Sequence, residues 1–111
     1  MVAVLAYAPD LMDRSKITAA AGREVVFVPS PPDLPGGARV SGVGVVVVDL
    51  SRPGVLEVLT EVASTGVRLI GFGSHVDREL LDAAGRAGCT EVMARSAFFH
   101  RLPELLAATR R

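Results

Sequence analysis

VVVVDLSRPG, at residues 45–54, decides the fold of this chain. Its four consecutive valines are β-branched, and such a run is typical of a central strand that helices cover on both faces. Asp49 follows the last valine and therefore stands at the carboxyl end of the predicted strand. Ligands and chemistry gather at the carboxyl ends of parallel strands, so Asp49 is the first candidate functional residue.

The rest of the chain alternates short apolar runs with segments of helical periodicity. Strands are predicted at residues 2–7, 24–28, 45–49, 68–72 and 91–94. Helices are predicted over about residues 10–22, 55–64, 77–88 and 101–109. Segment 29–44 is rich in proline and glycine, so we expect a loop there in place of most of a helix. This alternation indicates an α/β fold with a parallel sheet and helices on both faces.

Length and composition exclude several classes of protein. The 111 residues predict a single domain over 1–111 that is large enough to bury a core. Twelve Lys and Arg against twelve Asp and Glu give a net charge of zero, which argues against a nucleic-acid or a polybasic membrane surface. The sequence has no apolar run of membrane-spanning length and no basic segment before its apolar start, so we expect a cytoplasmic protein.

Cysteine and histidine are too scarce to suggest a disulfide or a metal cage. Cys89 is the single cysteine, and we expect it to behave as a small, buried apolar residue. His75 and His100 are far apart in the sequence. His75 is expected to cap the next helix or to face solvent, because no partner for catalysis is evident.

Three segments together carry a resemblance to a known family. They are residues 45–54, residues 68–75 and the stretch AGCTEVMARS at residues 87–96. In this order they resemble the third, fourth and fifth strands of response-regulator receiver (CheY-like) domains, and the resemblance covers essentially the whole chain. It implies a flavodoxin-like, doubly wound sheet of five parallel strands in the order 2-1-3-4-5. The proline and glycine content of segment 29–44 predicts in addition that the second crossover helix is short or missing.

The resemblance also implies where a phosphorylation site would lie. In the family, the aspartate at the position of Asp49 accepts a phosphoryl group from a histidine kinase, and an acidic pair after the first strand holds Mg²⁺. That pair falls on Ala8 and Pro9, which have no side-chain ligand for a metal. Asp10, one residue later, could supply one carboxylate, so Asp10 and Asp49 are the metal ligands to consider.

Two further family positions also differ in this chain. The family's hydroxyl residue after the fourth strand falls on Gly73, and Ser74 follows it. The family's lysine after the fifth strand falls on Arg95, whose guanidinium keeps the charge but has a different shape. A phosphoryl group in transfer needs metal and cations to offset its charge, so these departures weaken the site.

We therefore predict a pseudo-receiver, a receiver-like signalling domain that acts through protein–protein interaction, is not an enzyme and needs no cofactor. The first alternative is a working phosphoacceptor that uses Mg²⁺, is phosphorylated at Asp49 and has a histidine kinase as partner. The second alternative is a small α/β ligand-binding domain or enzyme. It is weakened because Ala8-Pro9-Asp10 stands where a glycine-rich phosphate loop would follow the first strand.

Simpler structural roles account for some of the same residues. Asp49 could cap the turn that follows it, or pair with Arg95 across the top of the sheet. Asp10 and Asp13 fit an N-cap and a first-turn carboxylate of the first helix. Arg14 and Lys16, in the same helix, are expected in solvent.

Phe98 and Phe99 are the candidate interface residues. Two adjacent phenylalanines cannot both point into a small core, so we expect one of them to form part of an interaction surface. The alternative is that one caps the core and the other covers an apolar patch near Leu102. In receivers, the face of the fourth helix, fifth strand and fifth helix is the usual interaction surface. The prediction is a protein partner or a homodimer through that face, with no nucleic acid and no membrane.

Overall fold

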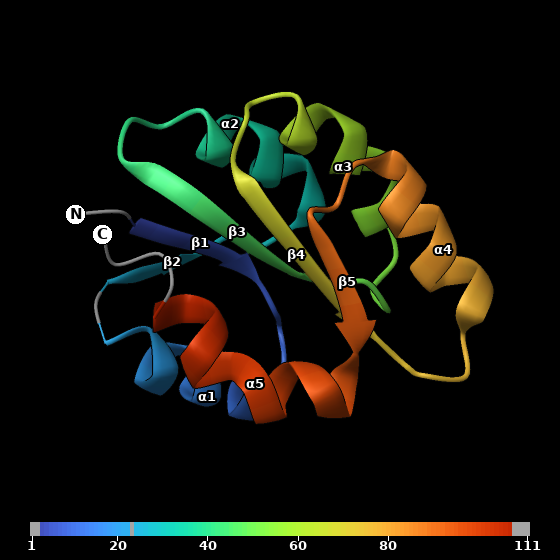
Figure 1. Ribbon diagram of the computed structural model, residues 1–111. Coiled ribbons are helices and arrows are strands. Elements are labelled where there is room, and N and C mark those ends of the chain that lie inside the picture. Colours follow the sequence, from blue (N-terminus) through green and yellow to red (C-terminus); the bar gives the residue numbers. More distant parts are fainter. Residues whose placement is uncertain (1–2, 23, 108–111) are drawn as a thin grey trace.

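The computed structural model describes residues 3–22 and 24–107, in which strands and helices alternate (Figure 1). The strands are β1 (Ala3–Tyr7), β2 (Val25–Phe27), β3 (Val43–Asp49), β4 (Arg68–Gly73) and β5 (Glu91–Ala94). The helices are α1 (Leu11–Ala21), α2 (Leu34–Ala38), α3 (Val55–Ala63), α4 (Arg78–Ala87) and α5 (Arg95–Ala107).

All five strands are parallel and form one sheet in the order β2-β1-β3-β4-β5. This is the predicted topology. The strand β3 lies at the centre, and its residues from Val45 to Val48 are almost completely buried. The run of valines therefore forms the doubly covered central strand that its composition indicated.

Helices cover both faces of the sheet. The side chains of β3 point alternately to the two faces, so this strand contributes to the hydrophobic core on each side. In Figure 1, α1 and α5 lie on one side of the sheet, and α2, α3 and α4 lie on the other. Val45 and Val47 pack in the core beneath α1 and α5. Val46 and Val48 pack in the core beneath the other three helices.

The second crossover helix is short, as predicted. A single 3-10 turn at Pro31–Asp33 leads into the five-residue helix α2. Gly37 lets α2 approach the sheet closely, since a Cβ atom there would lie 2.9 Å from a methyl carbon of Leu5. Gly37 thus weakens the helix and also allows what remains of it to pack closely on the sheet.

The last helix begins earlier than the sequence pattern suggested. It was expected from residue 101, but α5 starts at Arg95, directly after β5. Phe98 and Leu102 lie one turn apart on its buried side, so the inward-facing stripe begins before the predicted start. Pro103, which fits the first turn of the predicted helix, lies inside the observed one.

The helices of the described residues are short. The longest of them, α5, has 13 residues. Within residues 3–22 and 24–107, no helix combines the length and apolar character needed to cross a membrane.

Candidate functional site

The candidate residues meet at the carboxyl edge of the sheet, where the loops after β1, β3 and β4 and the start of α5 come together. A cavity of about 310 Å³ opens there. It is lined by Ser51, Gly73, Ser74, His75, Arg95 and Ser96. The parallel sheet brings these residues together because each follows the carboxyl end of its strand.

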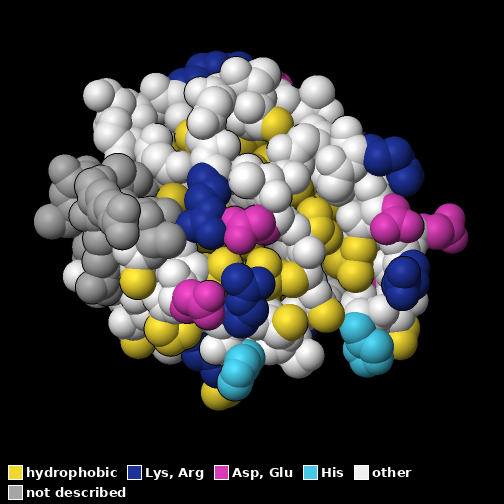
Figure 2. All heavy atoms as spheres, viewed as in Figure 1, with side chains coloured by type: hydrophobic (Ala, Val, Ile, Leu, Met, Phe, Trp, Pro, Cys, Tyr) yellow, Lys and Arg dark blue, Asp and Glu magenta, His cyan; other side chains and the backbone are white. Residues whose placement is uncertain are grey.

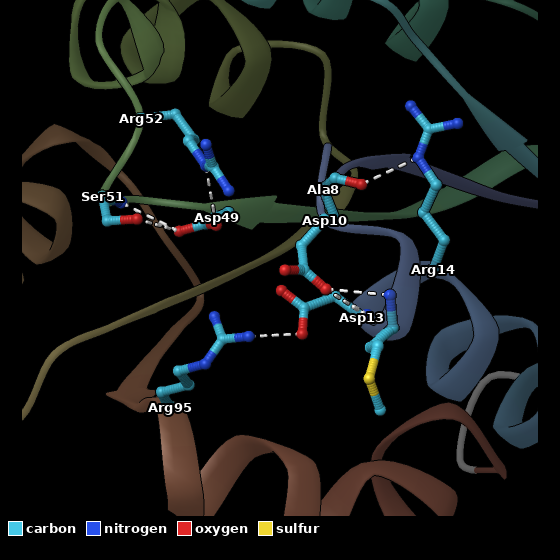
Figure 3. A network of polar contacts seen from close by, with 9 residues as sticks. Ala8, Asp10, Asp13, Arg14, Asp49, Ser51, Arg52 and Arg95 are labelled. Atoms are coloured by element: carbon cyan, nitrogen blue, oxygen red, sulfur yellow. Dashed lines mark hydrogen bonds and ion pairs between the residues drawn. The ribbon is translucent and has the colours of Figure 1, made fainter.

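Asp49 is 1% exposed, and its carboxylate is held by its own loop (Figure 3). The backbone N–H of Ser51 donates to Oδ1 at 3.0 Å, and the hydroxyl of Ser51 donates to the same oxygen at 2.6 Å. Arg52 Nε donates to Oδ2 at 3.3 Å. Both carboxylate oxygens are therefore engaged, and the charge of Asp49 faces the guanidinium of Arg52.

Arg95 binds Asp13, across the gap between the starts of α5 and α1 (Figure 3). The predicted pair between Asp49 and Arg95 is therefore wrong. Asp49 has the guanidinium of its own loop, and the buried carboxylate of Asp13 takes up Arg95. The hydrogen bond to Asp13 raises the pKa of Arg95, and the charges of Asp13 and Asp49 act in the same direction.

Asp13 is a first-turn carboxylate of α1, as expected, but its burial and its ion pair with Arg95 were not predicted. It is 1% exposed, and its Oδ2 is buried without a hydrogen-bond partner. Ile17 and Ala21, one and two turns later, are the other buried residues of α1. This spacing puts Asp13 on the inward stripe of the helix, and it is the signal that could have identified a buried carboxylate.

Asp10 is the N-cap of α1, as expected. Its carboxylate accepts hydrogen bonds from the backbone N–H groups of Met12 at 2.8 Å and Asp13 at 3.0 Å. The bond from Asp13 does most to lower the pKa of Asp10. This carboxylate is therefore committed to the start of α1.

The positions of the family's acidic pair are filled by groups that cannot bind a metal through side chains. Ala8 is buried, and its carbonyl accepts a hydrogen bond from Arg14 Nε at 2.9 Å. Arg14 is half-buried and also lies 5.0 Å over the ring of Phe27, so the expectation that it is solvated is wrong. Long cationic side chains can bury their stems in this way.

The donor set does not fit Mg²⁺. This ion prefers octahedral coordination by oxygen, usually with carboxylates and water. Asp10 caps a helix, both oxygens of Asp49 are engaged, and Ala8 and Pro9 offer no side-chain oxygen. The described residues contain no cluster of three or more His, Cys, Asp or Glu suited to a metal ion.

The two candidate interface residues have different environments. Phe98 is fully buried and stacks on Phe72 with ring centroids 4.4 Å apart. The suggestion that Phe98 is an interface residue is therefore wrong, because its ring is part of the core. Phe99 is half-buried, and Lys16 Nζ lies 5.1 Å from its ring centroid, so its open side faces α1 instead of α4.

The positions of His75 and Cys89 suggest no catalytic role for either residue. His75 is exposed at the rim of the cavity, and Cys89 is half-buried at the turn between α4 and β5. Burial raises the pKa of the Cys89 thiol to about 11, so the thiol is neutral at physiological pH. Neither residue is set up as a nucleophile.

Solved structures share this fold at low sequence identity. A response regulator from Hahella chejuensis superposes with a TM-score of 0.82 at 15% identity, covering 96% of this chain and 93% of that one. The receiver domain of NarL from Mycobacterium tuberculosis gives 0.78 at 16% identity, covering 99% and 98%. A receiver domain from Rhodospirillum rubrum gives 0.75 at 15% identity, covering 99% and 95%.

The similarity to these proteins is one of structure and not of sequence. No protein-family model matches the sequence, and no curated protein shows significant sequence similarity to it. The structural neighbours confirm that the chain has the CheY-like receiver fold, with five parallel strands in the order 2-1-3-4-5. Domains of this fold among the neighbours belong to response regulators, which are signalling proteins.

Proposed function

We propose that this chain is a pseudo-receiver, a signal-transduction domain that acts through protein–protein contacts without Mg²⁺-dependent phosphotransfer. One observation carries the proposal: both carboxylate oxygens of Asp49 already have hydrogen-bond partners. Ser51 donates to one oxygen, and Arg52 donates to the other. The cation expected to face a phosphoryl group, Arg95, is bound to Asp13 instead.

The chemistry of phosphoryl transfer explains why this arrangement matters. The attacking carboxylate oxygen must be free to approach phosphorus in line, and metal and cations must offset the charge of the transferred group. An oxygen of Asp49 could attack only after losing its hydrogen bonds from Ser51 or its ion pair with Arg52. Because the acidic pair is missing, no bound metal would compensate for the loss of these interactions of Asp49.

The proposed interaction surface is the face made by α4, β5 and α5. Figure 2 shows apolar side chains among charged groups on this face. Leu81, Val92 and Met93 are half-buried there, and β5 is an edge strand of the sheet. An ion pair at 2.6 Å joins Arg68 of β4 to Glu91 of β5 beside them. An apolar centre with charged neighbours suits a protein partner.

The absence of a basic excess argues against a nucleic-acid partner, because the chain has equal numbers of acidic and basic residues. A role as a binding module also requires no catalytic group. The cytoplasmic location expected from the sequence stays a prediction.

The second candidate, a phosphoacceptor, is favoured by the position of Asp49 at the end of the central strand, next to the cavity lined by Ser74 and Arg95. Two structural neighbours are described as phosphorylated: a cyanobacterial phytochrome response regulator, and a Burkholderia pseudomallei regulator with a phosphorylated aspartic acid and a calcium ion. If this candidate is right, a histidine kinase is the partner and Mg²⁺ is required.

Titration with Mg²⁺, followed by NMR of the backbone amides near Asp49, separates the two candidates. The pseudo-receiver predicts no saturable shift at millimolar Mg²⁺. The matched variant is Pro9→Asp, which returns one carboxylate to the position of the acidic pair and should gain a measurable shift. Saturable binding by the unmodified chain, lost in Asp49→Asn, would favour the phosphoacceptor.

A further inference from the structure

Five charged side chains meet at a gap on the carboxyl edge of the sheet, between the starts of α1 and α5 and the loop after β3 (Figure 3). They are Asp10, Asp13, Asp49, Arg52 and Arg95. The hydrogen bond from Asp13 does most to lower the pKa of Asp10, and the charges of the two arginines act in the same direction. All three aspartates raise the pKa of Arg95, Asp13 the most. Three carboxylates and two guanidiniums within electrostatic range leave one negative charge in excess.

The excess charge belongs to Asp10. Arg52 is paired with Asp49. Arg95 is paired with Asp13. Among the residues that the structure describes, none forms an ion pair with Asp10. Both hydrogen bonds that cap α1 end on Oδ1 of Asp10, and the side chain is exposed, so a group from outside can reach its Oδ2.

A second carboxylate oxygen at the gap is unsatisfied. Asp13 is 1% exposed, and its Oδ2 accepts no hydrogen bond within the described residues. Figure 3 shows its carboxylate beside that of Asp10 and directed towards the gap, and the N–H of Asp13 donates to Asp10 at 3.0 Å. A cation bound to Asp10 would therefore stabilise the buried oxygen as well, because a Coulomb interaction in a poorly hydrated place does not require direct contact.

Exposed aliphatic side chains stand next to these carboxylates. Leu11 is 76% exposed and Met12 is 68% exposed, and both directly follow Asp10 in the chain. Val76, in the loop after β4 at the same edge, is 74% exposed. An inorganic cation would leave these side chains in water. A protein segment with apolar residues around a basic one would cover them.

We propose that the carboxyl edge of the sheet docks a protein partner through a lysine that is flanked by apolar residues. The ammonium binds Oδ2 of Asp10 and supplies the positive charge that the five groups at the gap lack. The apolar neighbours of the lysine cover Leu11 and Met12. Lysine fits better than arginine because Asp10 offers one oxygen, whereas the planar fork of arginine is suited to both oxygens of one carboxylate.

This inference rests on the proposed function, because Mg²⁺ bound at the same gap would take the place of the ammonium. One free oxygen is enough for an ammonium group, whereas Mg²⁺ needs several oxygen ligands in octahedral geometry. The docking surface is different from the face of α4, β5 and α5 and leaves that face open to a second contact.

NMR titration of the backbone amides with a short peptide tests the proposal. The probe is N-acetyl-Leu-Lys-Leu-amide, and the matched neutral probe has glutamine in place of lysine. The lysine peptide should give a saturable shift of the amides of Met12 and Asp13, with an affinity about threefold higher than that of the glutamine peptide. Equal affinities for the two peptides overturn the proposal. A saturable shift of the same amides with KCl alone also overturns it, in favour of an inorganic cation.

Asp10→Asn is the variant that tests the site. Asparagine keeps the N-cap of α1 and removes the charge, so the fold should be retained while the affinity for the lysine peptide falls about threefold. The matched control is Asp77→Asn, because Asp77 is the N-cap of α4 and accepts a hydrogen bond from the N–H of Leu80 at 3.2 Å. This variant should bind the lysine peptide as the unmodified chain does. Equal losses in the two variants would show a response to net charge only and overturn the proposal.

Mg²⁺ titration of the same amides separates this inference from the proposed function. If neither the lysine peptide nor Mg²⁺ gives a saturable shift, the docking proposal is overturned and the pseudo-receiver stands. A saturable shift with Mg²⁺ overturns the pseudo-receiver and the docking proposal together.

Discussion

Asp13 and Arg95 form the most consequential pair of residues at the site. The carboxylate is nearly inaccessible, whereas the Arg95 side chain is 45% exposed. Arg95 also lies over the rings of Phe72 and Phe99, with its Cζ 5.5 and 5.2 Å from their centroids. The pair therefore ties the start of α5 to α1 and occupies the guanidinium of Arg95.

The unequal burial of this pair predicts unequal effects of substitution. Arg95→Met leaves a buried carboxylate without a cation and should lower the free energy of unfolding by about 2 kcal/mol, a value reduced for the exposure of the arginine. Asp13→Asn leaves the cation half in solvent and should cost about 1 kcal/mol. Urea denaturation of both variants measures the difference.

The control for this comparison is Arg101→Met. Arg101 lies on the same helix and makes a looser pair with Glu104 at 3.7 Å, so its loss should change stability by less than about 0.5 kcal/mol. A larger cost for Asp13→Asn than for Arg95→Met would contradict the account of the buried charge.

Cys89 gives a prediction for pH. Burial raises its pKa from 9.0 to about 11, so the neutral thiol is favoured in the folded state. Its contribution to stability is fully present below the unfolded pKa and is lost as pH rises through the folded pKa. Between about pH 8 and pH 11, the unmodified chain should therefore lose more stability than Cys89→Ala. Equal losses in parallel denaturation curves would show that the thiol ionises as freely as in the unfolded chain.

At the scale of residues, sequence patterns predicted local capping well and long-range pairing poorly. Asp10 was predicted as a cap because an N-cap acts on amides of its own helix. The partner of Arg95 lies 82 residues away in sequence, and nothing local distinguishes Asp13 from Asp49 as that partner. The capping of the turn after Asp49 was likewise predicted, and Ser51 supplies the donors, but the ion pair between Asp49 and Arg52 was not predicted.

At the scale of elements, α2 shows how glycine both weakens and shapes a helix. Gly36 has open space around the position of a Cβ atom, whereas a Cβ atom on Gly37 would press on the buried side chain of Leu5. These neighbours in one short helix provide a matched pair for substitution.

Gly36→Ala should stabilise the chain by about 0.5 kcal/mol, because alanine has the higher helix propensity and meets no obstacle. Gly37→Ala should instead destabilise it by about 1 kcal/mol, because Leu5 must shift within a packed core. Thermal unfolding of the two variants shows directly whether each substitution raises or lowers the stability of the chain. Stabilisation by both would mean that α2 packs less closely on β1.

The start of α5 is the element that the sequence placed wrongly. Its prediction rested on the helical spacing of Leu102, Leu105 and Leu106. Phe98 extends the stripe by one turn, but adjacent phenylalanines also fit a loop or an interface. Strands and the other helices were placed well because valine runs, caps and glycines mark their ends locally.

At the scale of the whole molecule, the sheet order could be predicted through the family resemblance, and the structure confirms it. The valine run fixes which strand is central, and alternation of strands with helices fixes parallel pairing. The resemblance could not predict how the charges at the carboxyl edge pair, because it implies no site residue at the positions of Asp13 and Arg52, and Arg95 replaces the family's lysine. In the proposed function, those pairs distinguish this site from a working phosphoacceptor site.

Incubation with acetyl phosphate and Mg²⁺, followed by intact-mass analysis, tests the central claim most directly. The account predicts no phosphoryl adduct on the unmodified chain, because both oxygens of Asp49 are engaged and Arg95 is bound to Asp13. Asp49→Ala should give the same mass spectrum apart from the substitution itself. An adduct on the unmodified chain that is absent from Asp49→Ala would contradict the pseudo-receiver account.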